Sequence, residues 1–296
     1  FVDVARVEVQ RGPQGTLYGR NTFGGNISVV TNQPDPSGFD FGFNAEIGSF
    51  ESVKADGFVN VPIGDLGAFR ISAAAHKSDG FVENVFNADA DLFDNDMRYI
   101  RAALLLEPTE NLSITLRADS LNQGGNGGSA FGYKLIGSYY DLALGQPVFN
   151  STPFILNTRP NNRDGVDDNP NIAGTQDLGV PIASPRDPFR IDQDLQTFLD
   201  LNRDGLGADI SWDVGPVTLR SITGKVDFKT ARSSDTDFSR NTLGIDYQLT
   251  ASESLSQEFQ VLSRHEGPFQ YVLGVYYFED DLRGVFINQQ LPPVIN

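Results

Sequence analysis

The 296-residue sequence contains no cysteine, which excludes disulfide frameworks, thiolate metal sites and cysteine nucleophiles. It has no run of about 18 apolar residues, which excludes a membrane-spanning helix. Basic residues are few, since 22 Lys and Arg stand against 39 Asp and Glu for a net charge of -17. Nucleic-acid binding requires clustered cations, so this balance argues against a nucleic-acid partner. A transmembrane β-barrel remains open, because its strands alternate lipid-facing and lumen-facing residues and are only half apolar.

Beyond Pro36 the sequence alternates apolar and polar residues in segments of about ten residues, separated by turn signals. In the first segment Phe41 and Phe43 share one face, and Asp40 and Asn44 share the other. The segments that predict strands are residues 39–47, 53–61, 69–75, 98–107, 112–118, 206–214, 217–228, 253–265 and 268–281. The apolar positions change parity after Leu219, which predicts a β-bulge there. The pattern indicates roughly nine antiparallel strands.

The connections between these segments differ in length according to the end of the sheet at which they lie. The tight turns are residues 63–67, 108–111, 214–217 and 265–268. The connections at the other end are the long loops 78–97, 123–194 and 229–250, apart from the short 48–52. This sorting is typical of an outer-membrane barrel, whose short turns face the periplasm. We expect the longest loop to be functional or mobile. The acidic loop 78–97 is either a solvated surface or a patch that attracts cations or bridges lipopolysaccharide through divalent ions.

The stretch "VEVQRGPQGTLYGRNTFGGNISVVTNQP", Val7 to Pro34, is rich in glycine between two short apolar runs. It is no phosphate-binding loop, because neither Gly-Lys-Ser/Thr nor Gly-x-Gly occurs in it. We expect its glycines to serve chain geometry through positive φ angles and close backbone approach. No Gly-x-Ser-x-Gly motif is present, and the two histidines, His76 and His265, lie far apart in sequence. We therefore expect no catalytic residue and no metal site.

The same stretch closely resembles the end of the plug domain of TonB-dependent outer-membrane receptors. The matching residues are Arg11, Gly12, Pro13, Leu17, Tyr18, Gly19, Gly24, Gly25, Ile27, Thr31 and Pro34. The segments "LRSITGKVDF", "SLSQEFQVLS" and "YVLGVYYFEDD" also look like barrel strands of this family. The resemblance implies an all-β fold, in which residues 1–36 form the C-terminal part of a plug domain. Residues 37–296 would then form the N-terminal part of an antiparallel transmembrane β-barrel of 22 strands. We accordingly expect a fragment of a longer protein.

The resemblance also implies a function, which is active uptake of a scarce nutrient across the bacterial outer membrane. The TonB-ExbB-ExbD complex would supply the energy, so the protein would be no enzyme and need no cofactor. A ferric siderophore is the expected substrate, and cobalamin, an oligosaccharide or another small organic nutrient are alternatives. Lipid and lipopolysaccharide would surround the barrel, and the substrate-binding residues stay unknown. A passive porin and a soluble β-rich enzyme or lectin are the competing classes.

The residues of the plug motif are expected to act in structure or gating, namely Arg11, Gly12, Pro13, Tyr18, Gly19, Gly24 and Gly25. In the family, plug arginines pair with barrel glutamates to hold the plug in the lumen. The resemblance therefore predicts an ion pair between Arg11 and Glu258, which alternation places on one face with Gln260.

Overall fold

The computed structural model describes residues 2–13, 23–84, 87, 89–127, 138–141, 146–149, 189–191, 193, 195–235, 244–264 and 268–290. Almost all of its regular structure is β-strand, with a single 3-10 turn at Gly64–Leu66 within these residues.

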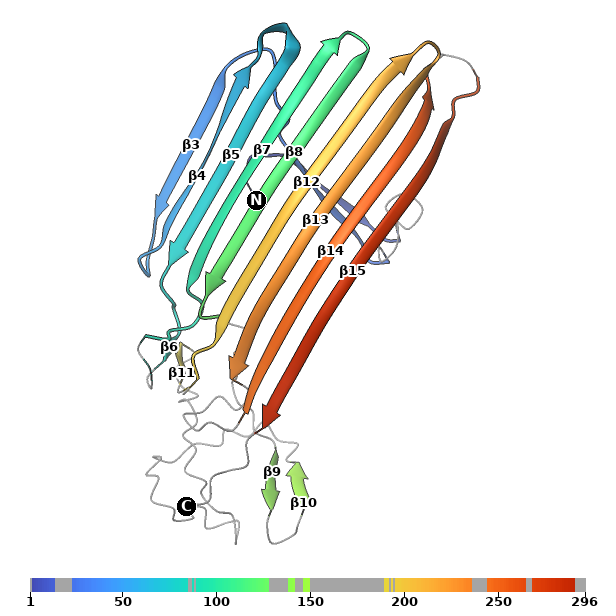
Figure 1. Ribbon diagram of the computed structural model, residues 1–296. Coiled ribbons are helices and arrows are strands. Elements are labelled where there is room, and N and C mark those ends of the chain that lie inside the picture. Colours follow the sequence, from blue (N-terminus) through green and yellow to red (C-terminus); the bar gives the residue numbers. More distant parts are fainter. Residues whose placement is uncertain are drawn as a thin grey trace.

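Nine antiparallel strands form one large sheet in the described part of the chain, which confirms the all-β class and the expected strand number. Its order is β15-β14-β13-β12-β8-β7-β5-β4-β3. The strands are β3 (Asp40–Ile47), β4 (Val53–Pro62), β5 (Gly67–Ser78), β7 (Asn95–Thr109), β8 (Leu112–Gly125), β12 (Phe198–Val214), β13 (Val217–Asp235), β14 (Gly244–Ser263) and β15 (Val272–Gln290). Neighbouring strands of the sheet follow one another in sequence, as in an up-and-down barrel (Figure 1). The large sheet is also called the wall below.

A small sheet of two antiparallel strands, β1 (Val4–Arg11) and β2 (Gly25–Thr31), lies behind the large sheet in Figure 1. Two further pairs lie beyond the ends of the large sheet. One is the parallel pair β6 (Glu83–Asn84) and β11 (Arg190–Ile191), and the other is the antiparallel pair β9 (Ser138–Asp141) and β10 (Gln146–Phe149). Part of the expected loop 123–194 thus contains short strands.

The two faces of the large sheet differ in chemistry. The face toward the small sheet, here called the inner face, carries polar residues such as Arg70 and Arg101, which contact the small sheet. The opposite, outer face exposes a band of large apolar side chains: Phe41, Val59, Leu116, Leu206, Ile210, Trp212, Leu219, Phe259, Leu273 and Val275. A continuous exposed apolar surface of this kind marks contact with lipid or another apolar partner. On β12 it runs from Leu206 to Val214, about 26 Å at roughly 3.3 Å per residue, close to the apolar band height of about 25 Å in outer-membrane barrels.

The strands extend further than the sequence predicts. β13 continues to Asp235 and β14 begins at Gly244, so most of the expected loop 229–250 is strand, contrary to the prediction. At 19 residues, β13 spans roughly 60 Å, more than twice the apolar band. Beyond the band its outer positions are polar, and alternation no longer reveals the strand.

The β-bulge predicted after Leu219 is wrong, because β13 pairs with both neighbours in unbroken register. The parity of the apolar residues changes for another reason. Val217 and Leu219 lie on the outer face within the apolar band. Ile222 and Phe228 lie on the inner face, and the residues of β13 beside them that face outward are polar. The register shift in this region of the wall lies between Leu106 and Thr109, at the end of β7.

Candidate functional site

The end of the small sheet needs glycine at one position above all. Gly25 pairs with Arg11 and has a φ of 131°, and a Cβ atom there would lie 2.3 Å from the carbonyl oxygen of Gln10. Gly12 has a φ of 83°, in the left-handed region that favours glycine. The expectation that these glycines serve chain geometry is confirmed at both positions. Pro13 and Gly24 also lie within the described residues, whereas Tyr18 and Gly19 lie outside them.

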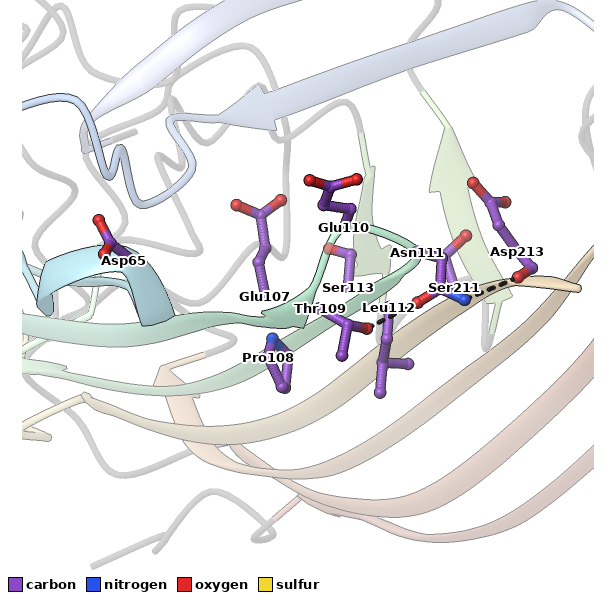
Figure 2. Close-up of a pocket in the computed structure, with 10 residues that line it drawn as sticks. All are labelled: Asp65, Glu107, Pro108, Thr109, Glu110, Asn111, Leu112, Ser113, Ser211 and Asp213. Atoms are coloured by element: carbon purple, nitrogen blue, oxygen red, sulfur yellow. Dashed lines mark hydrogen bonds between the residues drawn. The ribbon is translucent and has the colours of Figure 1, made fainter.

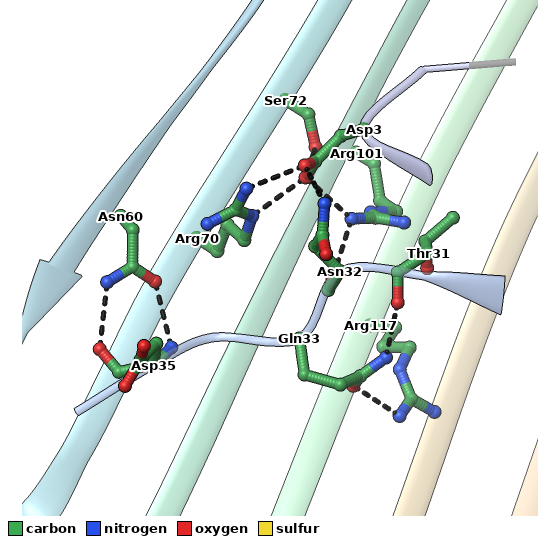
Figure 3. Close-up of polar contacts among 10 residues, drawn as sticks. All are labelled: Asp3, Thr31, Asn32, Gln33, Asp35, Asn60, Arg70, Ser72, Arg101 and Arg117. Atoms are coloured by element: carbon green, nitrogen blue, oxygen red, sulfur yellow. Dashed lines mark hydrogen bonds and ion pairs between the residues drawn. The ribbon is translucent and has the colours of Figure 1, made fainter. Parts of the chain in front are cut away.

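Asp3, just before β1, joins the small sheet to the inner face of the large sheet (Figure 3). Arg70 of β5 binds its carboxylate with two hydrogen bonds, from Nε at 2.8 Å and Nη2 at 2.6 Å. Ser72 of the same strand donates its hydroxyl at 3.0 Å, and Arg101 of β7 donates Nη2 at 3.1 Å. Asn32, after β2, adds its side-chain amide at 2.8 Å. Asp3, Asn32, Arg70, Ser72 and Arg101 are called the clamp below.

The clamp is closed to solvent. The side chain of Asp3 is 1% exposed, and those of Arg70 and Arg101 are each 6% exposed. Burial opposes ionisation of the carboxyl, but the hydrogen bonds from Arg70, Asn32 and Ser72 outweigh it and hold the pKa of Asp3 below its ordinary value. Asp3 also has a positive φ of 53°, a conformation that Asp tolerates better than most residues. A buried, ionised carboxylate with two arginine partners therefore fixes the small sheet in place.

Residues 32–39, called the connector, run from the small sheet to β3 along the inner face. Asn60 of β4 binds the main chain of Asp35 in both directions and also donates to the carbonyl oxygen of Gly38 at 2.9 Å. Arg117 of β8 donates Nη2 to the side-chain oxygen of Gln33 at 2.7 Å. Arg101 donates in addition to the main-chain oxygen of Asn32 at 3.0 Å. Three strands of the large sheet, β4, β7 and β8, thus hold the connector (Figure 3).

The sequence predicted a link between the two sheets but placed it on other residues. Arg11 is exposed at the end of β1, and Glu258 of β14 accepts a hydrogen bond from Gln260 at 2.7 Å. The ion pair between Arg11 and Glu258 stays a prediction. The clamp shows the opposite polarity, with the carboxylate on the small sheet and the arginines on the wall. One signal could have found it, since arginines that alternation places on the inner face require counter-ions when they are buried.

A hollow of about 550 Å³ lies at the turn between β7 and β8 (Figure 2). Asn111 shapes it by bonding across to Asp213, with its side chain donating to the Asp213 carbonyl at 3.2 Å and its carbonyl accepting the Asp213 amide at 2.8 Å. The lining carboxylates are Asp65, Glu107, Glu110 and Asp213. Within the described ranges, no group of three or more His, Asp or Glu side chains is arranged to hold a metal ion.

Among the described residues, no helix is both long enough and apolar enough to cross a membrane.

Comparison with known proteins finds similarity to outer-membrane receptors. No family model matches it. The pesticin receptor of Yersinia pestis is 45% identical over 67 residues, which are 22% of this chain and 10% of that receptor. The metal-pseudopaline receptor CntO of Pseudomonas aeruginosa is 35% identical over 81 residues, 26% of this chain and 11% of that receptor. The matches therefore span about a tenth of the length of these relatives.

Solved structures match over nearly the whole chain. The ferric yersiniabactin uptake receptor FyuA from Yersinia pestis aligns with a TM-score of 0.66 at 17% identity, covering 98% of this chain and 38% of that one. The chain resembles TonB-dependent outer-membrane receptors. The siderophore receptor PiuA from Acinetobacter baumannii aligns with a TM-score of 0.64 at 14% identity, covering 95% of this chain and 36% of that one. The resemblance stated from the sequence is confirmed, and the expected outer-membrane location agrees with these neighbours.

Proposed function

We propose that the protein is a TonB-dependent receptor for active uptake across the bacterial outer membrane, with a ferric siderophore as its substrate. In this proposal residues 1–36 belong to the plug and residues 37–296 to the barrel. The TonB-ExbB-ExbD complex acts on the plug and supplies the energy. The protein performs no chemical conversion of its substrate.

The observation that carries the proposal is the attachment of the small sheet to the inner face through Asp3, Arg70 and Arg101. A passive porin needs an open lumen and has no use for an element anchored inside the wall. An anchor of a few polar contacts, by contrast, can hold a plug and still be released. The glycine-rich stretch Val7 to Pro34 carries no phosphate-binding motif, which agrees with an energy source other than a nucleotide bound there.

The iron substrate is supported by relatives and neighbours that are named as receptors for siderophores or metal complexes. Cobalamin, oligosaccharides and other small organic nutrients are the alternatives within the same type of receptor. While the small sheet is docked, the clamp residues do not discriminate among these substrates, because all five are engaged with one another.

Growth of a strain that lacks this gene tests the proposal. On a panel of ferric chelates as sole iron source, the strain should fail on at least one chelate that supports the wild type, and loss of TonB should give the same defect. Restoring the intact gene should restore growth only when TonB is present. Growth without TonB on that chelate would favour the porin. A TonB-dependent defect confined to cobalamin or an oligosaccharide would replace the iron substrate and keep the receptor.

A further inference from the structure

Three arginines lie side by side on the inner face where the small sheet and connector meet the wall. Arg70 of β5 pairs with Ala103 of β7, and Ala103 pairs with Arg117 of β8, so the two arginines flank one residue. Two strand spacings separate them by about 10 Å between their backbones. Arg101 lies two residues from Ala103 on the same face of β7 and completes the group.

The wall offers these arginines little neutralising charge. Among the described residues, Asp3 is the single carboxylate within 4 Å of Arg70 or Arg101. Arg117 donates to the neutral amide oxygen of Gln33.

The nearest wall carboxylates have arginines of their own. Asp209 accepts two hydrogen bonds from Arg220, at 2.9 and 2.7 Å, and Asp119 pairs with Arg203. Asp40 of the wall and Asp35 of the connector add weaker, longer-range attraction at Arg70, and Asp209 does so at Arg117. Movement of the small sheet and connector away from the wall would therefore leave Arg70, Arg101 and Arg117 with an excess of positive charge.

The site also contains one hydrogen-bond donor that lacks an acceptor. Nη1 of Arg101 is buried and has no acceptor among the described residues. A buried guanidinium nitrogen without a partner is costly, and it would accommodate a further oxygen atom. Arg70 meanwhile holds the Asp3 carboxylate through two parallel bonds, the fork geometry by which arginine recognises carboxylates.

We propose that Arg70, Arg101 and Arg117 form a binding site for a carboxylate-bearing anion, and that Asp3 occupies this site while the small sheet is docked. This deepens the proposed function, on which it rests, by naming the chemical class of the cargo as a chelate with carboxylate groups. Once the small sheet leaves, the cargo carboxylate takes the place of Asp3 at the wall. The same arginines thus bind Asp3 while the small sheet is docked and bind the cargo after the small sheet has left.

Chemical rescue with acetate tests carboxylate recognition in the purified full-length protein. The Asp3→Ala variant removes the carboxylate and leaves its donors in place. Hydrogen exchange of the β1 and β2 amides should be faster in this variant than in wild type. Acetate should slow exchange by about tenfold, the effect of regaining one charge-assisted hydrogen bond, whereas acetamide or an equal concentration of chloride should not.

A matched variant shows whether acetate acts at this site. In Asp3→Ala/Arg70→Gln the acetate effect should disappear. If acetate and chloride act alike, or if acetate slows exchange equally without Arg70, the arginines do not recognise a free carboxylate and the proposal is wrong. Should Asp3→Ala fail to fold, the wild-type protein answers the same question. Acetate should then compete with Asp3 and accelerate exchange of β1 and β2, and no acceleration beyond that of chloride would count against the site.

Measurements of uptake then distinguish a role of the arginines in cargo binding from their role in anchoring the small sheet. In cells that carry Asp3→Asn, where the anchor is already weakened, a further Arg117→Gln change should slow uptake of a carboxylate-bearing chelate by about tenfold. Uptake of a chelate without carboxylates should not change, nor should binding of either chelate at the cell surface. Equal slowing of both chelates would overturn the cargo role. If wild-type cells take up neither, the proposed function fails, and the acetate measurement still decides whether the site exists.

Discussion

The side chain of Asn60 is fully buried and forms a closed pair of hydrogen bonds with the main chain of Asp35. Its amide nitrogen donates to the Asp35 carbonyl at 2.8 Å, and its oxygen accepts the Asp35 amide at 2.9 Å. The second amide hydrogen binds the carbonyl of Gly38 at 2.9 Å. A single side chain of β4 therefore fixes the path of the connector immediately before β3.

Replacing Asn60 by alanine should release the connector. Three hydrogen bonds would be lost and their main-chain partners left unsatisfied, so we expect a cost of about 1–3 kcal/mol in the free energy of unfolding. Asn44→Ala on β3 is the control, because Asn44 is exposed and makes a long bond of 3.3 Å to Asp56, and it should cost less than about 0.5 kcal/mol. Denaturant unfolding in detergent measures both. Equal costs would show that the connector does not depend on Asn60.

The Asp3→Asn variant should detach the small sheet. It leaves the buried arginines without a counter-charge, and breaking a buried ion pair costs about 3–5 kcal/mol. Protease sensitivity of residues 2–13 measures the effect. Asp35→Asn is the matched control, since Asp35 is exposed and the amide oxygen can still accept from Ser37. Resistance of the Asp3→Asn protein to cleavage would contradict the importance of the clamp.

Docking of the small sheet should weaken in acid. The pKa of Asp3 is lowered in the folded protein, so the carboxylate contributes its full stabilisation above the ordinary pKa of aspartate, and this contribution is lost as pH falls through the lowered value. The protection factors of the β1 amides, which correct for the intrinsic pH dependence of exchange, should therefore be constant from about pH 5 to 8 and fall below about pH 4. Other carboxylates titrate in the same range, so the informative quantity is the difference from Asp3→Asn, which should shrink as pH falls. A constant difference would argue against an ionised Asp3.

Gly25→Ala should disrupt the end of the small sheet. Its Cβ would lie 2.3 Å from the Gln10 carbonyl oxygen, and its φ of 131° disfavours any side chain. Gly24→Ala is the matched control, because no atom lies within 4 Å of the added Cβ. We expect faster amide exchange at Gln10 and Arg11 in the first variant alone. Similar exchange in both would mean that the pairing of Arg11 with Gly25 is dispensable.

Ile210→Arg should destabilise the large sheet in lipid. Ile210 lies midway along the apolar band of β12, where an arginine facing lipid costs about 2–4 kcal/mol. Asn202→Arg lies on the same face, eight residues away and beyond the band, and should cost less than about 1 kcal/mol. Unfolding free energies in lipid vesicles compare the two. Similar values would show that the band does not end where the outer face turns polar.

The sequence predicts the wall where lipid imposes alternation on it. Phe41, Val59 and Leu116 are apolar because they face the same outer surface, so a period of two is visible in each strand. Beyond the band, Asp227 and Lys229 face the outside with no need to be apolar, and the period disappears although the strand continues. The alternation of apolar and polar residues therefore could not predict where β13 ends and β14 begins.

The clamp was not predictable for a different reason. Asp3 and Arg70 are separated by 67 residues, and alternation gives the face of a residue but not its partner across the lumen. The motif drew attention to Arg11, whose pairing with Glu258 stays a prediction, and gave no indication of the bonds at Asp3. Gly25 was easier, because a requirement for positive φ and close approach is local and belongs to the residue type itself.

The pairing of Val4 with Thr31 gives the small sheet a definite mechanical polarity. β1 begins at the same end at which β2 leaves for the connector, so tension between the chain ahead of Asp3 and the wall would separate the strands one hydrogen-bonded pair at a time rather than shear them all together. Peeling of this kind meets little resistance at each step. Asp3 and Asn32 bond to each other at the first step, through side chains and main chain alike. The mechanical threshold of the small sheet is therefore set at its first pair, and once Asp3 yields, the remaining pairs should part at a lower force.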